Sequence, residues 1–222
     1  MRCLRRRVPS EGRRPLEALV SSRIAVVDYG AGNLRSAARA LAAAGATNVE
    51  VTSDPARIAS ADRILLPGVG AFAHCINALR GAAGIEDALT EAVQGAQRPF
   101  LGICVGMQLL ASEGHEHGVH RGLGWLPGLV TRLVPDDPAL KIPHMGWNTV
   151  TAANDSGIAA GDAYFVHSYR FDPGDAADIR ATSDHGGVFP AIVSRGNITG
   201  VQFHPEKSQA YGLAFLRNWL AA

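Results

Sequence analysis

The residue best suited to nucleophilic chemistry is Cys104, at the centre of the pentapeptide Gly-Ile-Cys-Val-Gly at 102–106. This pattern has the form of a nucleophile elbow, G-x-S-x-G, with cysteine in place of serine. Its two glycines permit a tight turn from a strand into a helix that exposes the central side chain. The positive end of the following helix favours the thiolate, which is the attacking form. Because most free cysteines are small buried core residues, the pentapeptide needs partner residues before it indicates catalysis.

A base and a group to orient it stand later in the chain, in Phe203-His-Pro-Glu206. Residues two apart in an extended segment point to the same side, so His204 and Glu206 can face one site. His204 would exchange a proton with Cys104 and protonate the leaving group, while Glu206 would fix the imidazole tautomer and support its positive form. Taken alone, the segment is better explained as a turn with a surface ion pair, because Pro205 favours turns.

The third candidate feature is the glycine-rich segment Pro67-Gly-Val-Gly70, which follows a different apolar run. Ligands bind at the carboxyl ends of strands in open α/β sheets, and glycine-rich backbone there leaves N–H groups free to face a tetrahedral oxyanion. We expect Val69 and Gly70 to contribute to this oxyanion site. The backbone N–H of Val105, the residue after the nucleophile, would supply a further donor.

Three such segments can meet only if the elements before them lie side by side. Continuous apolar runs that predict buried strands occur at 24–28, 63–66 and 99–103, with a shorter strand at 49–52. Helical spacing of apolar residues predicts helices at 34–44, 72–94 with an interruption at 81–84, and 105–112. This alternation predicts a parallel sheet with helices on both faces.

The second half of the chain has shorter apolar runs between turn residues. We expect antiparallel strands at 129–134, 148–151, 163–169, 187–194 and 199–203, joined to the edge of the parallel sheet, and a closing helix at 211–220. The predicted fold is therefore α/β, with a largely parallel central sheet flanked by helices and antiparallel strands added in the C-terminal half.

Composition limits the remaining classes. The chain of 222 residues is 47% apolar and 18% charged, which is typical of a globular protein with one large domain. No apolar run approaches the roughly 18 residues of a membrane span, so we expect no membrane association. Three cysteines without a C-x-x-C pair exclude a disulfide framework and favour a reducing, cytoplasmic setting.

The net charge of +1 is unevenly distributed. Residues 1–21 carry six arginines and two glutamates, a charge of +4, which leaves −3 on the rest of the chain. We expect 1–21 to be an unstructured extension and 22–222 to be the functional domain. A slightly acidic domain lacks the basic surface that nucleic acid requires.

Two other motifs do not indicate cofactors. His115-Glu-His-Gly-Val-His120 resembles a metal cluster, but Val119 occupies the second histidine position of H-E-x-x-H and the surrounding glycines oppose a helix. Tyr29-Gly-Ala-Gly-Asn33 resembles a dinucleotide loop, yet Arg35 stands where the third glycine would fall. We therefore expect no metal and no cofactor, a solvated loop at 115–120, and Cys75 in a helix core.

Taken together, the motifs resemble the triad class of glutamine amidotransferases, through Gly-Ile-Cys-Val-Gly-Met-Gln108 and Val-Gln-Phe-His-Pro-Glu206. More narrowly, the chain from Ile24 onward is similar to the glutaminase subunits of imidazole glycerol phosphate synthases. The motifs that carry this resemblance are Asp28-Tyr-Gly-Ala-Gly-Asn-Leu-Arg-Ser36, Leu66-Pro-Gly-Val-Gly-Ala-Phe72, Gly122-Leu-Gly-Trp125, Pro143-His-Met-Gly-Trp-Asn148, Phe165-Val-His-Ser-Tyr169 and 200–208.

The resemblance implies hydrolysis of glutamine to glutamate and ammonia, with Cys104 forming a glutamyl thioester. It places Gln108, Glu116, Ser168 and Tyr169 at the glutamine site. It implies a heterodimer with a (β/α)8 cyclase subunit that uses the ammonia to make imidazole glycerol phosphate in histidine biosynthesis. Activity in the family is weak until the partner binds its nucleotide ligand, and the oxyanion strand, here 67–70, must rearrange.

The resemblance also implies where the cyclase subunit binds. It places Asn33, His144, Met145 and Trp147 at or near the interface. Trp147 has the large flat surface typical of interface anchors. A core tryptophan beside a turn is the alternative explanation for this residue.

Three other functions are compatible with parts of the pattern. A glutaminase of another pathway, such as anthranilate, carbamoyl phosphate or guanylate synthesis, would not need the motif at 143–148. A noncatalytic regulatory subunit would be expected to lose the cysteine, the histidine or the oxyanion glycines, and all are present. A cysteine hydrolase with an unrelated substrate would share the elbow without needing Gln108 or the His-Pro-Glu arrangement.

Overall fold

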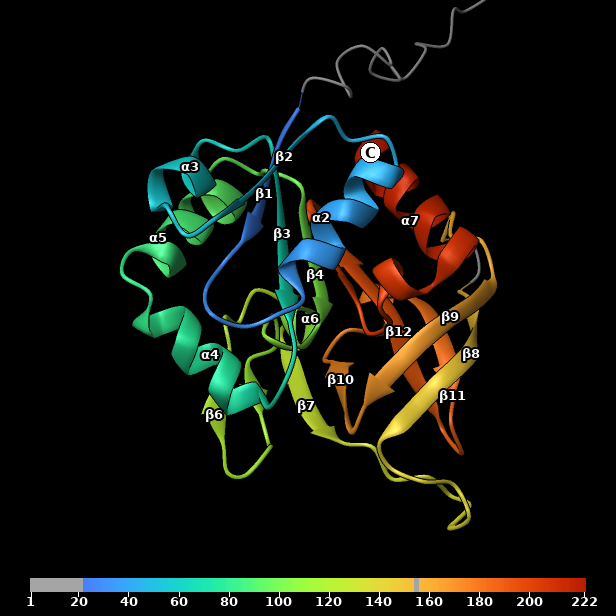
Figure 1. The fold of residues 1–222 in the computed structure, drawn as a ribbon. Helices are drawn as coiled ribbons and strands as arrows, with labels where there is room; N and C mark the ends of the chain where they lie inside the picture. The colour runs from blue at the N-terminus through green and yellow to red at the C-terminus, as the bar shows by residue number, and fades with distance from the viewer. Residues whose placement is uncertain (1–21, 154–155) are drawn as a thin grey trace, which may run out of the picture.

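The structure is a computed structural model that describes residues 22–153 and 156–222 (Figure 1). The predicted N-terminal extension, 1–21, lies outside the described residues. A large mixed sheet runs through the centre of the described part, with helices on both of its faces, as the sequence predicts. None of the helices formed by the described residues has the length and apolar character needed to cross a membrane.

The large sheet has nine strands in the order β2-β1-β3-β4-β13-β12-β11-β8-β9. The first five are mutually parallel and the last four alternate in direction. Their bounds are β1 Arg23–Val27, β2 Asn48–Thr52, β3 Arg63–Gly68, β4 Phe100–Cys104, β13 Ile198–Val201, β12 Val188–Arg195, β11 Ile179–Asp184, β8 His144–Ala152 and β9 Gly161–His167.

The direction of β13 corrects a prediction. It was expected to be antiparallel at the sheet edge, but it lies beside β4 and parallel to it. The reason is its tight hairpin with β12, which turns at Gly196, a residue with a φ of 59°. Because β12 runs against the parallel strands, the strand that returns from its hairpin runs with them. Strand β11 was not predicted.

A second, four-stranded sheet was not predicted either. It has the order β10-β7-β5-β6, with β10 Tyr169–Pro173, β7 Gly128–Arg132, β5 Glu113–Gly114 and β6 His120–Arg121. The single strand expected at 163–169 is therefore two strands, β9 and β10, which belong to different sheets. Ser168 lies at the break between them. The short strands β5 and β6 flank residues 115–119, so the loop expected at 115–120 ends one residue earlier, where β6 begins at His120.

Helices α2 (Leu34–Ala43) and α7 (Gln209–Ala221) pack together on one face of the large sheet. The other face carries α3 (Pro55–Ala59), α4 (Phe72–Gly81) and α5 (Ile85–Thr90), which continues as a π-helix at Glu91–Gly95. Short 3₁₀ turns occur at Ala176–Asp178 and Pro205–Lys207. Cys75 is fully buried in α4, as expected.

Helix α6 is shorter than predicted. It spans Val105–Gln108 rather than 105–112. After Gln108 the backbone closes tighter turns, with the N–H of Ala111 donating to the carbonyl of Gln108. The N–H of Ser112 then donates to the carbonyl of Gly128, which begins the second sheet. Pairing with that sheet therefore ends the helix although the apolar residues continue.

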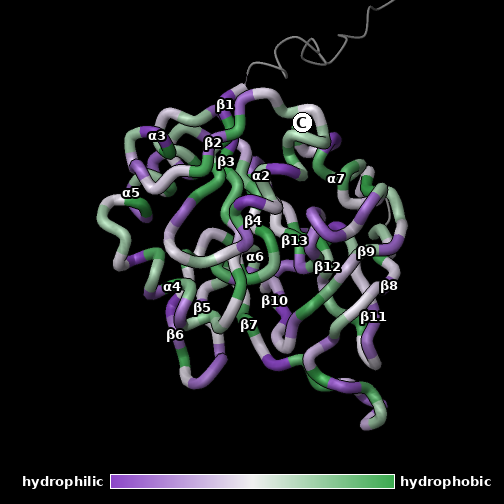
Figure 2. The backbone as a smooth tube through the Cα atoms, in the orientation of Figure 1, coloured by the Kyte–Doolittle hydropathy of each residue, from purple (hydrophilic) through white to green (hydrophobic). Residues whose placement is uncertain are grey.

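The core lies along the central strands, where β3 and β4 are buried over their whole lengths. Figure 2 shows these strands as largely hydrophobic, with hydrophilic residues concentrated on the outer segments. Burial on both faces explains why the two strands are continuous apolar runs in the sequence.

Strands β3, β4 and β13 are neighbours, so their carboxyl ends meet at one edge of the sheet. The register pairs Gly68 with Cys104 and Ile103 with Val201. The three chemically interesting segments, 67–70, 104–106 and 202–206, begin at this edge and are therefore brought together by the fold.

Candidate active site

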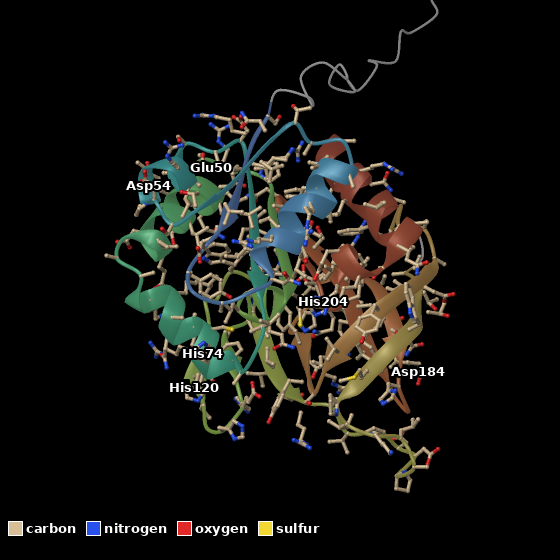
Figure 3. All side chains as sticks on the ribbon, viewed as in Figure 1. Glu50, Asp54, His74, His120, Asp184 and His204 are labelled. Carbon is tan, nitrogen blue, oxygen red and sulfur yellow. The ribbon has the colours of Figure 1, made fainter. Side chains whose placement is uncertain are left out.

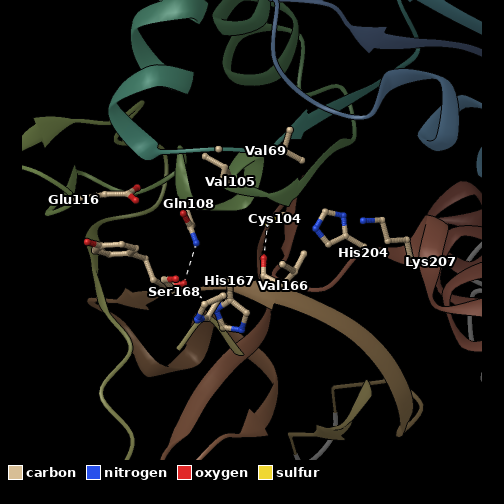
Figure 4. Close-up of a pocket in the computed structure, with 13 residues that line it drawn as sticks. Val69, Cys104, Val105, Gln108, Glu116, Val166, His167, Ser168, His204 and Lys207 are labelled. Carbon is tan, nitrogen blue, oxygen red and sulfur yellow. Dashed lines mark hydrogen bonds between the residues drawn. The ribbon is translucent and has the colours of Figure 1, made fainter. Parts of the chain in front are cut away.

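A cavity of about 270 Å³ opens at the carboxyl ends of these strands (Figure 4). Nine of the predicted catalytic, oxyanion and substrate residues line it, namely Val69, Gly70, Cys104, Val105, Gln108, Glu116, Ser168, Tyr169 and His204. The tenth, Glu206, lies behind His204 and contacts its ring. Residues separated by more than 100 positions thus form one site.

Cys104 sits on a strained turn. Its φ of 55° is in the left-handed region that non-glycine residues rarely adopt. The glycines on either side are required by close packing: a Cβ atom at Gly102 would lie 2.5 Å from the carbonyl oxygen of Gly106, and one at Gly106 would overlap the carbonyl oxygen of Leu66. The turn aims the Cys104 side chain into the cavity, as expected of a nucleophile elbow.

His204 and Glu206 form a buried pair. The Nδ1 atom of His204 lies 2.7 Å from Oε1 of Glu206, and both side chains are almost inaccessible to solvent. The backbone differs from the extended segment expected, because a 3₁₀ turn begins at Pro205. This turn still brings the carboxylate beneath the imidazole. The other ring nitrogen, Nε2, has no hydrogen-bond partner among the described residues.

The electrostatic surroundings favour a positive His204. Burial by itself would lower the pKa of the imidazole, but the neighbouring Cys104 sulfur and the Glu206 carboxylate outweigh it and raise this pKa to about 10. Helix α6 is a single turn, so the helix dipole contributes less to a Cys104 thiolate than the sequence suggested. A positive imidazole beside the Cys104 sulfur is the form that can donate a proton to a leaving group.

Two side chains hold the backbone of the oxyanion segment, 67–70, in place. The carbonyl of Pro67 accepts a hydrogen bond from the Tyr29 hydroxyl at 2.9 Å, and the carbonyl of Val69 accepts one from the Cys75 thiol at 3.4 Å. Gly70 has a φ of 106°, which a residue with a side chain would adopt only under strain. Val69 is partly exposed to the cavity.

Gln108 and Glu116 approach the cavity from two further elements. Nε2 of Gln108 donates to the carbonyl of Tyr169 and to Oε1 of Gln202, both at 3.0 Å. Oε2 of Glu116 accepts a hydrogen bond of 2.7 Å from the backbone N–H of Phe72, at the start of α4. A carboxylate oxygen and an amide oxygen therefore remain available to a ligand that donates hydrogen bonds.

Sequence reasoning missed one polar residue in direct contact with the nucleophile. Gln202 is fully buried, and its Nε2 lies 3.7 Å from Sγ of Cys104. The sequence did contain one signal, because a polar residue directly follows the apolar strand β13. If such a residue is buried, its amide needs hydrogen-bond partners nearby. Pro143, Val166, His167 and Lys207 also line the cavity.

The predicted interface residues differ in exposure. Met145 and Trp147, on β8, are 62% and 50% exposed, so Trp147 is not a core tryptophan. Asn33 lines a narrow crevice behind His204 and Glu206. His144 is buried, with 4% exposure, and its ring stacks against Phe165 in the core, so its predicted place near the interface would be behind the exposed residues of β8. It can affect a partner only through its neighbours.

In the part of the chain that the structure describes, the histidines of the 115–120 segment are not grouped with other metal-ligating side chains as a metal site requires. The described residues contain no group of three or more histidine, cysteine, aspartate or glutamate side chains that could hold a metal ion. His120 lies at the periphery, near His74 of α4, whereas His204 lies near the centre of the molecule (Figure 3). Within this segment, Glu116 is the residue that lines the cavity.

Comparison with protein families identifies one domain over almost the whole chain. The family model described as glutamine amidotransferase class-I matches residues 25–222. The chain is 56% identical over 204 residues to the imidazole glycerol phosphate synthase subunit HisH of Zymomonas mobilis, covering 90% of this chain and 96% of that protein. It is 53% identical over 209 residues to the HisH subunit of Rhodospirillum rubrum, covering 89% and 98%.

Solved structures share the fold at lower sequence identity. A crystal structure of a glutamine amidotransferase superposes with a TM-score of 0.70 at 20% identity, covering 89% of this chain and 98% of that one. The structure of PurLQS from Thermotoga maritima superposes with a TM-score of 0.67 at 19% identity, covering 90% and 97%. These likenesses support the α/β architecture.

Proposed function

The chain belongs to the class I glutamine amidotransferase family, among the HisH subunits of imidazole glycerol phosphate synthase, and we propose that it hydrolyses glutamine and delivers the ammonia to a cyclase partner in histidine biosynthesis. The partner uses the ammonia to make imidazole glycerol phosphate. The observation that carries the chemistry is the constellation of Cys104, His204 and Glu206 at the carboxyl ends of β4 and β13.

The first half of the reaction forms a thioester. The Cys104 sulfur attacks the side-chain amide carbon of glutamine, and the carbonyl oxygen becomes a tetrahedral oxyanion. Positive His204 donates its proton to the amide nitrogen, the carbon–nitrogen bond breaks, and ammonia leaves. Glu206 keeps the imidazole oriented by accepting a hydrogen bond from its Nδ1 atom.

The second half releases glutamate. His204, now neutral, takes a proton from a water molecule that attacks the thioester carbon. The carbon–sulfur bond then breaks, glutamate leaves, and the sulfur–imidazolium pair is restored. Backbone N–H groups at Val69, Gly70 and Val105 stabilise the oxyanion in both halves, after the segment 67–70 adjusts.

The remaining cavity residues recognise glutamine. Glu116 and the free oxygen of Gln108 accept hydrogen bonds from its amino group, and the break between β9 and β10 presents Ser168 and Tyr169. Support for this assignment comes from their shared cavity, which is of a size suited to a single amino acid. The acceptors select a substrate that carries an ammonium group.

The partner is a (β/α)8 cyclase subunit in a heterodimer. Met145 and Trp147 are large, exposed apolar residues two positions apart on β8, which makes them a suitable anchor for a protein interface. We place the complex in the cytoplasm, since Cys75 and Cys104 are both free thiols. Residues 22–222 are the amidotransferase domain, and 1–21 form an extension outside it.

The experiment that tests this function is a glutaminase assay of the purified chain, alone and with the cyclase subunit and its nucleotide ligand. We expect glutamate to form slowly with the chain alone and much faster in the complete complex. A matched Cys104→Ala variant measures the background. The proposal fails if the complex forms but produces no more glutamate than this variant.

A further inference from the structure

Two buried histidines that take no part in the proposed reaction form a hydrogen-bonded pair beside the site. His144 of β8 and His167 of β9 are register partners on neighbouring strands, and Nδ1 of His144 lies 3.0 Å from Nε2 of His167. Both side chains are enclosed, with Phe165 and Phe189 packed around them. A hydrogen bond between two imidazoles requires one nitrogen to donate and the other to accept.

One end of the pair fixes the proton on His167. Its Nδ1 lies 2.9 Å from the carbonyl oxygen of Tyr169, which can only accept a hydrogen bond. Nδ1 of His167 therefore carries the hydrogen. In the neutral ring, Nε2 is left with a lone pair, and this lone pair faces His144.

The opposite end fixes the proton on His144 independently. Oδ1 of Asn148 accepts from the backbone N–H of Thr149 at 2.8 Å, so Nδ2 of Asn148 is the donor. This Nδ2 donates to the carbonyl of Asp184 at 2.7 Å and lies 3.2 Å from Nε2 of His144. Nε2 of His144 must then accept, and its hydrogen sits on Nδ1, directed at His167.

The two ends therefore require the same arrangement, in which both rings are neutral and both carry hydrogen on Nδ1. A second proton on either ring would place two hydrogens in one of these contacts. Burial, with His185 stacked on His144, lowers the pKa of His144 to about 4, and burial lowers that of His167 to about 3. The chain of hydrogen bonds is thus intact at neutral pH.

This series of hydrogen bonds ends at the carbonyl oxygen of Tyr169, which also accepts a hydrogen bond from Gln108. The carbonyl oxygen of Tyr169 accepts from Nδ1 of His167 and from Nε2 of Gln108, one bond for each lone pair. With its other N–H on Gln202, Gln108 has both amide hydrogens occupied inside the protein. Its oxygen is the atom left for a ligand in the cavity.

We infer that His167 and His144 are positioning residues for the substrate. Through the Tyr169 carbonyl they orient the Gln108 amide so that its oxygen, rather than its nitrogen, meets glutamine. This inference rests on the proposed glutaminase function. Loss of the His167 donor would leave Tyr169 and Gln108 free to reorient. The Gln108 oxygen would then no longer be held toward glutamine. Substrate binding would therefore weaken more than the chemical step slows.

The first test is direct and does not depend on activity. Nitrogen-15 NMR of the histidine rings in the intact chain, at neutral pH, reports which nitrogen of each ring carries hydrogen. We expect both His144 and His167 to be neutral with hydrogen on Nδ1. A neutral ring with hydrogen on Nε2, or a charged ring, at either residue would overturn the inference.

The second test compares two variants in the complex with the cyclase subunit. His167→Leu removes the donor to Tyr169, and we expect the KM for glutamine to rise about 10-fold with a smaller change in kcat. His167→Asn keeps an N–H donor near the position of Nδ1 and should stay within about 3-fold of the parent KM. His185→Gln is the matched control, because His185 stacks on His144 but bonds to the carbonyl of Lys141 instead.

The outcomes separate the two proposals. Equal KM values for the Leu and Asn variants, or a fall in kcat alone, would overturn the positioning role. If His167→Leu does not fold, the NMR measurement on the parent protein still tests the proton positions that the inference requires. If the parent complex releases no glutamate, the proposed function fails, whereas the proton positions measured by NMR stand independently.

Discussion

Gly68 and Cys104 are register partners on the neighbouring parallel strands β3 and β4, and the helix that follows Cys104 packs directly against the backbone of β3. A Cβ atom at Gly68 would lie 2.6 Å from the backbone nitrogen of Gly106. This contact between backbones fixes the nucleophile relative to the oxyanion segment, which begins at the end of β3. The distance between them is therefore set by the sheet rather than by flexible side chains.

The first prediction concerns this contact. Gly106→Ala would place a methyl group against the carbonyl of Leu66, and the backbone has no room to yield. We expect the free energy of unfolding to fall by about 3 kcal/mol or more, together with loss of glutaminase activity. Urea unfolding followed by circular dichroism measures the first effect. Gly81→Ala is the control, since nothing lies within 4 Å of its added methyl group, and it should change stability little.

The second prediction concerns the different reactivity of the two described cysteines. Burial raises the pKa of the Cys75 thiol to about 11, which leaves a thiolate fraction about 100-fold below that of an ordinary thiol. Cys104 lines the cavity beside a positive histidine. Iodoacetamide at pH 7.5 should therefore modify Cys104 before Cys75 and abolish activity in parallel. Peptide mapping by mass spectrometry identifies the site, and preferential modification of Cys75 would contradict the assignment.

The third prediction separates glutamine hydrolysis from ammonia use. His204→Asn removes the base and should lower the glutamine-dependent rate of the complex by about 1,000-fold or more. The cyclase should continue to work when ammonium salt replaces glutamine, because the variant changes only the source of ammonia. Both rates can be measured in one spectrophotometric assay. Equal losses with glutamine and with ammonium would show that the substitution disrupts the complex itself.

The parallel half of the fold could be predicted because its strands are buried on both faces. β1, β3 and β4 are continuous apolar runs, and glycines follow them where the chain turns. β11 escaped prediction because its apolar residues are interrupted by Arg180, Thr182 and Ser183, so the strand is not a continuous apolar run. The direction of β13 and the break at Ser168 depend on which strands pair. A short run of apolar residues does not show which strand will be its neighbour.

The candidate site was predictable to the extent that its chemistry is local. Cys104 stands in a recognisable turn, and His204 and Glu206 are close in sequence. Gln202 and His167 act through hydrogen bonds to residues from other strands. Their roles exist only once the strands are assembled, so the sequence showed no more than polar residues within apolar segments.

The fourth prediction concerns the proposed partner surface on β8. Trp147→Ala would remove a half-exposed aromatic ring whose edge packs against Tyr164. If Trp147 anchors the cyclase subunit, the Kd of the complex should rise roughly 30-fold, as expected for an anchor worth about 2 kcal/mol. Isothermal titration calorimetry measures the Kd. Val51→Ala, at an exposed site on β2 at the far edge of the sheet, should leave it unchanged.

The fifth prediction is that stability is greatest near pH 6.5, the pKa of histidine in the unfolded chain. His204 has a raised pKa of about 10 in the folded protein, so its contribution is complete below pH 6.5 and is lost as the pH rises toward 10. His144 and His167 have lowered pKa values of about 4 and 3. Between those values and pH 6.5 the unfolded chain binds more protons, so stability also falls as the pH is lowered.

Urea unfolding at pH 4.5, 6.5 and 8.5 tests both sides of this maximum, and single variants assign each side to its histidine. His204→Asn should weaken the fall between pH 6.5 and 8.5 while leaving the acidic side unchanged. His167→Asn should weaken the fall between pH 6.5 and 4.5 and leave the alkaline side unchanged. These opposite effects follow from the surroundings of each ring: His204 faces the Cys104 sulfur and a carboxylate, whereas His167 faces a carbonyl and a neutral imidazole. If both variants flattened the same side of the curve, the assigned proton positions would be wrong.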